Sequence, residues 1–162
     1  PVVRGGRVWI FYGGWNLPYT HEAMDRAADG WTEDGQIMQR AIGVATLPMD
    51  RFVSWTADSE VGELTSQPVV HAGGPVLINA AIRGSLRVGL LGEDGSGIEG
   101  CGIDECEPLS GDDLRHRPRW PSGDGHRLRG RSLRLCLRLQ DGDLFAFGWE
   151  KESGRCRASP SG

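Results

Sequence analysis

The chain has 162 residues, of which 38% are hydrophobic, and it contains 25 glycines and nine prolines. This length supports one hydrophobic core, or one domain with part of another. The net charge of −4 gives no reason to expect nucleic acid as a partner, and no apolar segment is long enough to span a membrane. Many turn residues between short apolar runs predict an all-β protein.

The N-terminal part contains two predicted strands and a long connection. Residues 7–12 are a run of strand-forming residues after two glycines, and we expect this strand to end at Gly13-Gly14. Residues 17–39 form the connection, with a short helix predicted over residues 22–28. The apolar run of residues 42–47, which Pro48 ends, predicts the second strand. The chain begins at Pro1 without a methionine, and a lone aromatic strand needs neighbours, so we expect missing sequence upstream.

After Asp50 the pattern predicts seven or eight short antiparallel strands. The clearest alternation lies in residues 132–139, where every second residue is an inward-facing leucine. We expect Asp94-Gly95 and Asp141-Gly142 to form hairpin turns, because glycine supplies the positive φ that such turns need. Residues 50–150 are therefore predicted to form a two-sheet antiparallel β-sandwich. A disordered tail is predicted over residues 151–162, which are polar and small.

The sequence offers no metal or cofactor motif. No two cysteines form a C-x-x-C pair, and no two histidines have metal-binding spacing, so surface or hydrogen-bonded histidines are expected. There is no Walker loop or dinucleotide fingerprint, and we expect no cofactor. Cys101 and Cys106 are close enough in sequence to bridge a short loop in an oxidising compartment, but free buried thiols are the favoured interpretation.

Several short segments are distinctive when taken together. They are F-Y-G-G-W-N at residues 11–16, A-T-L-P at 45–48, D-R-F-V-S at 50–54, G-E-L-T at 62–65 and D-L-F-A-F at 143–147. This set resembles the C-terminal end of invertase- and levanase-type glycoside hydrolases and related proteins with a five-bladed propeller. The resemblance implies that residues 1–49 are the last strands of a propeller blade with an inserted loop. It also implies that residues 50–150 form a jelly-roll or concanavalin-like β-sandwich.

Such hydrolases cleave glycosidic bonds with two carboxylates. The resemblance places both carboxylates in earlier blades, so we expect no catalytic residue in this chain and a missing N-terminal propeller as its partner. Glu105-Cys106 imitates the acid motif of the family but lies in the predicted sandwich. The paired acids Asp104-Glu105 and Asp112-Asp113 are interpreted as solvated turn residues.

The candidate carbohydrate-binding residues lie in the long connection and at its two ends. They are Trp15, Asn16, His21 and Arg40. An aromatic ring can stack on a sugar, while an amide, an imidazole and a guanidinium can bind its hydroxyls. The resemblance includes a similar tryptophan, asparagine and histidine run followed by an arginine, although His21 stands two positions later than in the family. Trp15 could equally pack between blades.

These features lead to one favoured hypothesis and two alternatives. The favoured hypothesis is an accessory C-terminal region of a glycoside-hydrolase-like protein that lacks the catalytic carboxylates. The first alternative is a stand-alone carbohydrate-binding or adhesion sandwich, which needs exposed aromatic rings. Trp120 and Trp149 are the only tryptophans after Trp55. The second alternative is a structural interaction domain without a ligand.

Overall fold

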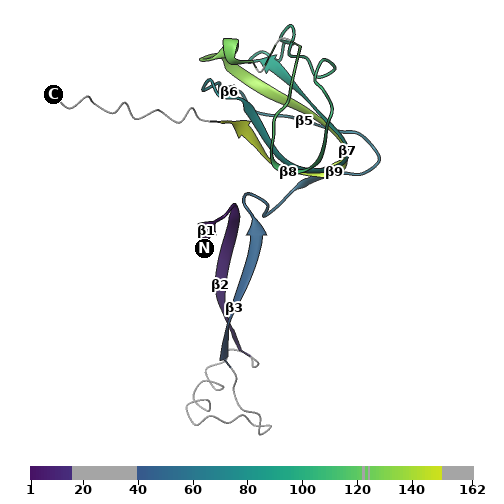
Figure 1. Ribbon diagram of the computed structural model, residues 1–162. Coiled ribbons are helices and arrows are strands. Elements are labelled where there is room, and N and C mark those ends of the chain that lie inside the picture. Colours follow the sequence, from purple (N-terminus) through teal and green to yellow (C-terminus); the bar gives the residue numbers. More distant parts are fainter. Residues whose placement is uncertain (16–39, 122, 124, 151–162) are drawn as a thin grey trace, which may run out of the picture. The chain divides into compact units, whose positions relative to one another are not determined.

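The computed structural model describes residues 1–15, 40–121, 123 and 125–150. It divides into an N-terminal unit, Pro1–Met49, and a C-terminal unit, Asp50–Gly162. Strands dominate the described residues of both units, and all of the strand pairing is antiparallel (Figure 1). The prediction of an all-β protein is confirmed.

The N-terminal unit contains a three-stranded sheet in the order β1-β2-β3. Its strands are β1 (Val2–Arg4), β2 (Arg7–Trp15) and β3 (Arg40–Pro48). Gly5 and Gly6 have φ values of 59° and 69° and form the tight turn between β1 and β2. The predicted end of the strand at Gly13-Gly14 is wrong, because both glycines pair with β3 and β2 continues to Trp15. The predicted helix over residues 22–28 lies outside the described residues.

The C-terminal unit contains a six-stranded sheet built around one long strand, β9. β9 pairs with β7 on one side and with β6, β5 and β4 in succession on the other, while β8 pairs with the outer edge of β7. A 3-10 turn, η1 (His126–Leu128), precedes β9. The strands are β4 (Trp55–Ala57), β5 (Gly62–Thr65), β6 (Val69–Val70), β7 (Val76–Gly92), β8 (Leu109–His116) and β9 (Ser132–Trp149).

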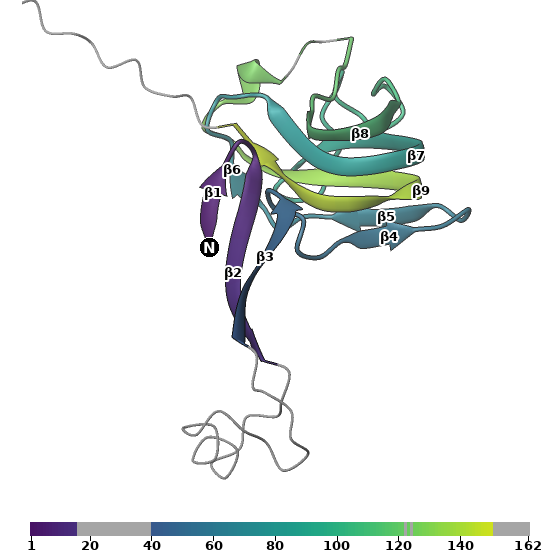
Figure 2. The same cartoon turned by 60° about the horizontal axis from the view of Figure 1, so that its bottom comes forward.

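The two long strands, β7 and β9, are each a single bent strand. Between the pairs Ile82–Gly142 and Ser85–Gln140, β7 contributes two residues and β9 contributes only Asp141, which is a β-bulge. Asp141 has a φ of 49°, so the expected hairpin at Asp141-Gly142 is wrong: the positive φ serves a bulge, and the strand continues. Figure 2 shows β7 and β9 curving together as neighbours.

This bend replaces the predicted pair of sheets. All six strands are hydrogen-bonded into one sheet, so the prediction of two separate sheets is wrong, as is the count of seven or eight strands. The sandwich-like all-β character is confirmed. A bent sheet can bury one of its own faces, which gives it a core without a second sheet.

The core lies on one face of the two long strands. Leucines alternate inward along β9 as predicted, and β7 contributes Ile78, Leu86, Val88 and Leu90. Loops and η1 cover this face with Cys101, Cys106, Trp120 and Leu128. The inward leucines of β9 are Leu133, Leu135, Leu137, Leu139 and Leu144.

Candidate functional site

The predicted carbohydrate-binding residues are only partly within the described structure. Trp15 and Arg40 are direct cross-strand partners at the end of the β2–β3 pair. Their backbone positions are therefore adjacent, because directly opposed residues of an antiparallel pair are roughly 5 Å apart. Asn16 and His21 lie outside the described residues. The structure thus brings together the backbone of two of the four positions.

The sequence did not predict a polar cluster centred on Arg51. The Arg51 guanidinium donates from Nε to Asn79 Oδ1 at 2.8 Å and from Nη2 to Asp112 Oδ1 at 2.5 Å. It also lies over the Phe145 ring, 4.5 Å from the ring centroid. The Arg51 side chain is only 11% exposed, whereas that of Asp112 is 66% exposed. We call these four residues the Arg51 cluster.

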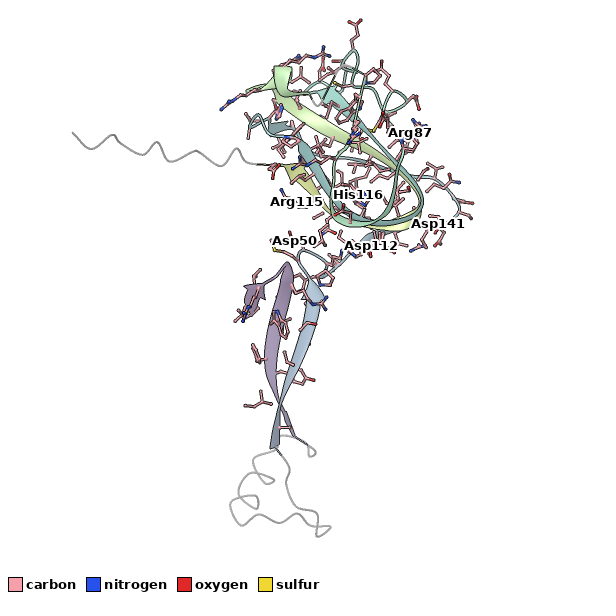
Figure 3. All side chains as sticks on the ribbon, viewed as in Figure 1. Asp50, Arg87, Asp112, Arg115, His116 and Asp141 are labelled. Carbon is pink, nitrogen blue, oxygen red and sulfur yellow. The ribbon has the colours of Figure 1, made fainter. Side chains whose placement is uncertain are left out.

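The electrostatics of the Arg51 cluster favour ion pairing. The hydrogen bond and the positive charge of Arg51 hold the pKa of Asp112 below its usual value. Asp112 and His116 both belong to β8 (Figure 3). A general acid needs a raised carboxyl pKa, so Asp112 is suited to binding the guanidinium and not to protonating a leaving group.

Two of the histidines are buried and hydrogen-bonded. His71 Nδ1 accepts a hydrogen bond from Gly73 N–H at 3.1 Å, and its ring stacks on Trp149 with centroids 4.1 Å apart. His116 Nε2 donates to the carbonyl oxygen of Ala80 at 3.2 Å. The interpretation of these residues as hydrogen-bonded histidines is confirmed, but they are not at the surface.

The acidic residues near the bend are also engaged by arginine. Arg83 Nε donates to Asp141 Oδ1 at 2.7 Å, and its Nη1 donates to Asp143 Oδ2 at 3.0 Å. Thr56 Oγ1 donates to the other oxygen of Asp143 at 2.6 Å. Arg138 pairs in the same way with Glu63 and Asp104, at 2.7 Å each. These carboxylates stabilise neighbouring strands across the sheet.

Lowering the pH is expected to reduce the stability of the C-terminal unit through protonation of Asp143. The hydrogen bonds from Thr56 and then Arg83 lower its pKa in the folded state. Its stabilising effect is therefore complete above the unfolded-state pKa of about 4 and is lost as the pH falls through the lower folded-state value. We expect the urea midpoint to fall with acidification, and Asp143→Asn to flatten this dependence. Identical pH profiles for the two proteins would contradict the assignment.

The described part of the C-terminal unit contains hollows of two different characters. One has a volume of about 300 Å³ and a mostly apolar lining that includes Val69, Leu135, Phe147 and Trp149. Ser66 also lines it, but its hydroxyl already donates to Gln67 O and accepts from Leu135 N–H. This hollow suits an apolar group better than a sugar, which needs several hydrogen-bonding partners.

The second hollow is polar and has a volume of about 750 Å³. It lies between residues 96–100 and η1, and its lining includes Glu99, Arg127 and Arg131. Arg127 Nη2 donates to the carbonyl oxygen of Glu99 at 2.6 Å, which fixes one side of the guanidinium. The remaining groups can bind hydroxyls or an anion, but they do not form a catalytic pair.

Within residues 1–15, 40–121, 123 and 125–150, no group of three or more His, Cys, Asp or Glu side chains is placed to hold a metal ion. In the same residues, no helix has the length and apolar character needed to cross a membrane.

Cys101 and Cys106 are buried thiols that form no disulfide, as expected. Burial raises the pKa of Cys106, and its Sγ donates to the carbonyl oxygen of Glu107 at 3.2 Å. Because burial shields both sulfur atoms from the reagent, we expect neither thiol to be alkylated by iodoacetamide at neutral pH until the protein unfolds. The half-buried Cys136 provides an internal comparison. Peptide mass spectrometry that finds Cys106 alkylated as fast as Cys136 would contradict this prediction.

The described residues therefore contain the paired positions Trp15 and Arg40, the Arg51 cluster and two hollows. Comparisons with models of protein families, with curated proteins and with solved structures found no match to this chain.

Proposed function

We propose that this chain is the C-terminal accessory region of a glycoside-hydrolase-like protein. In this proposal, residues 1–49 complete the last blade of a β-propeller, and residues 50–150 form a sandwich-like all-β domain that supports it. The catalytic carboxylates lie in the propeller and not in this chain. The sequence resemblance suggests this function, and one observation on the N-terminal unit gives it physical support.

That observation is the apolar character of both faces of the β1-β2-β3 sheet. Cross-strand partners share a face, so Phe11 and Val44 lie on one face together with Ile42. Val3 and Tyr12 lie on the other face. All five side chains are at least 50% exposed, and Ile42 is 86% exposed. A sheet with large apolar side chains on both faces needs a layer on each side. A propeller blade has such layers, because its neighbours pack on both of its faces.

The proposed substrate contacts lie at the end of this sheet. Trp15 and Arg40 occupy paired positions there, and Asn16 follows Trp15 directly in the chain. An aromatic residue beside an arginine is suited to stacking on a sugar ring and binding its hydroxyls. His21 completes the set that the resemblance implies. The parent reaction would be hydrolysis of a glycosidic bond by two carboxylates of the missing propeller.

Glycosidase assays on two proteins test this proposal. We expect this chain alone to show no turnover of chromogenic glycosides or oligosaccharides, and the polypeptide extended by its upstream sequence to show activity. In the extended protein, Arg40→Ala should raise KM, because it removes a substrate contact. Arg7→Ala, on the same sheet but bound to Thr46 at 2.8 Å, is the matched control and should leave KM unchanged. Turnover by this chain alone, or an inactive extended protein, would contradict the proposal.

One observation favours the stand-alone carbohydrate-binding alternative. Trp55 is 57% exposed, and its ring centroid is 6.2 Å from that of the half-buried Phe147. In contrast, Trp120 is buried, and one face of Trp149 is covered by His71. If the alternative holds, the full chain should bind a polysaccharide and Trp55→Ala should abolish that binding. Failure of the chain to bind any of a panel of polysaccharides would exclude it.

A further inference from the structure

We propose that Asp50 is a single-residue joint between the two units and that Arg51 is the latch that keeps the joint this short. This inference concerns the chain as it stands and does not depend on the proposed function. It rests on where the chain is anchored immediately before and after Asp50.

On the N-terminal side, the backbone is held up to Met49. β3 pairs with β2 as far as the partners Pro48 and Arg7. Met49 N–H then donates to the carbonyl oxygen of Gly6 at 2.9 Å, which extends the anchorage by one residue. The N-terminal unit therefore determines the backbone position of Met49.

On the C-terminal side, the first anchored residue is Arg51. Its guanidinium contacts Asn79 in β7, Asp112 in β8 and Phe145 in β9. Asn79 and Phe145 belong to the second bulge of the long strands, where Asn79 pairs with Ala146 and Ala80 pairs with Leu144. This bulge leaves Phe145 as the extra residue of β9, and the Phe145 ring lies under the guanidinium.

Arg51 is more buried than four other arginines that form ion pairs in the described part of the chain. Arg83, Arg115, Arg117 and Arg138 have side chains between 35% and 58% exposed, whereas that of Arg51 is 11% exposed. Exposed ion pairs contribute little, because water screens them. A nearly buried arginine with two hydrogen bonds and an aromatic ring holds its backbone more firmly.

Asp50 itself has a φ of 59°, in the left-handed region. Aspartate is one of the few residues besides glycine that adopt this conformation readily. Without the latch, the next anchored position would be Trp55, where β4 begins to pair with β9. Phe52 and Val53 lie between them and are well exposed. Without the contacts of Arg51, residues 50–54 would connect the anchored positions Met49 and Trp55. With these contacts, only Asp50 lies between two anchored residues.

Heteronuclear NOE and proteolysis measurements on the full chain test this inference. We expect the Arg51 amide of the wild type to be as rigid as those of β7. Arg51→Met should lower the NOE of residues 51–54 and speed chymotryptic cleavage after Phe52 by about tenfold, which corresponds to about 1.4 kcal/mol of opening free energy. Arg138→Met removes an arginine with two acidic partners away from the joint and should change neither quantity.

A second variant keeps the test decisive if Arg51→Met fails to fold. Asp112→Asn leaves the contacts of Arg51 with Asn79 and Phe145 in place, so it should fold and accelerate the cleavage by a smaller factor. A wild-type Arg51 amide that is already mobile would overturn the inference. Wild-type cleavage rates in every latch variant that folds would also overturn it.

Discussion

Replacing Gly84 with alanine is expected to destabilise the C-terminal unit by about 1–3 kcal/mol, because the added methyl group would overlap the backbone of β9. A Cβ at this position would lie 2.4 Å from the carbonyl oxygen of Gln140 and 3.1 Å from the Cβ of Asp141. Both atoms belong to β9 directly opposite the bulge, and neither can move away as the end of a flexible side chain can. The structure can accept the methyl group only by separating β7 from β9 at the bend.

Urea denaturation of Gly84→Ala measures this cost as a lower midpoint. Gly148→Ala is the matched control, because it also adds a methyl group to a long strand of the same sheet. Nothing lies within 4 Å of a Cβ at Gly148. We expect Gly148→Ala to change stability by less than about 0.5 kcal/mol, as surface substitutions usually do. Equal midpoints for the two variants would show that the bend is not as tightly packed as described.

Replacing Trp120 with alanine is expected to cost about 3–5 kcal/mol, the usual range for a large buried aromatic residue. Trp120 is 5% exposed and comes from the loop between β8 and η1, which covers the core face of the bent sheet. Its indole Nε1 donates to the carbonyl oxygen of Val88 at 2.9 Å. The substitution leaves a cavity over the core and removes the hydrogen bond from a buried carbonyl group.

Two variants separate these contributions. Trp120→Phe keeps most of the ring volume but removes the donor, so we expect a smaller loss of about 1–3 kcal/mol. Trp55→Ala removes an exposed tryptophan of the same unit and should cost less than about 1 kcal/mol. Thermal or urea unfolding followed by circular dichroism gives all three values. If Trp120→Ala were no more harmful than Trp55→Ala, the loop would not contribute to the core.

The contrast between two Asp-Gly pairs shows where local sequence stops being informative. At Asp94-Gly95 the predicted turn is present: Gly95 has a φ of 85°, and its N–H donates to the carbonyl oxygen of Gly92 at 3.0 Å. At Asp141-Gly142 the same dipeptide lies inside β9. A positive φ serves a turn and a bulge equally well. Only the partner strand β7, about sixty residues earlier in the chain, decides between them.

The candidate sites show the same division. Trp15 and Arg40 were expected at the two ends of the long connection, and they are cross-strand partners because β2 and β3 pair along their whole length. The Arg51 cluster was not predicted. Its hydrogen-bonding partners lie 28 and 61 residues further along the chain, and neither has a recognisable spacing from Arg51.

The sequence alone determined the properties that depend on neighbouring residues. Turn residues between short apolar runs indicated the all-β class, and the alternation of leucines identified the buried face of β9, because successive side chains of a strand point to opposite faces. Only the tertiary structure decided that the predicted strands merge into two long ones, that one bent sheet replaces two, and that Arg51 is anchored at three strands. These features depend on backbone hydrogen bonds and ion pairs between distant residues, which leave no periodic pattern in the sequence.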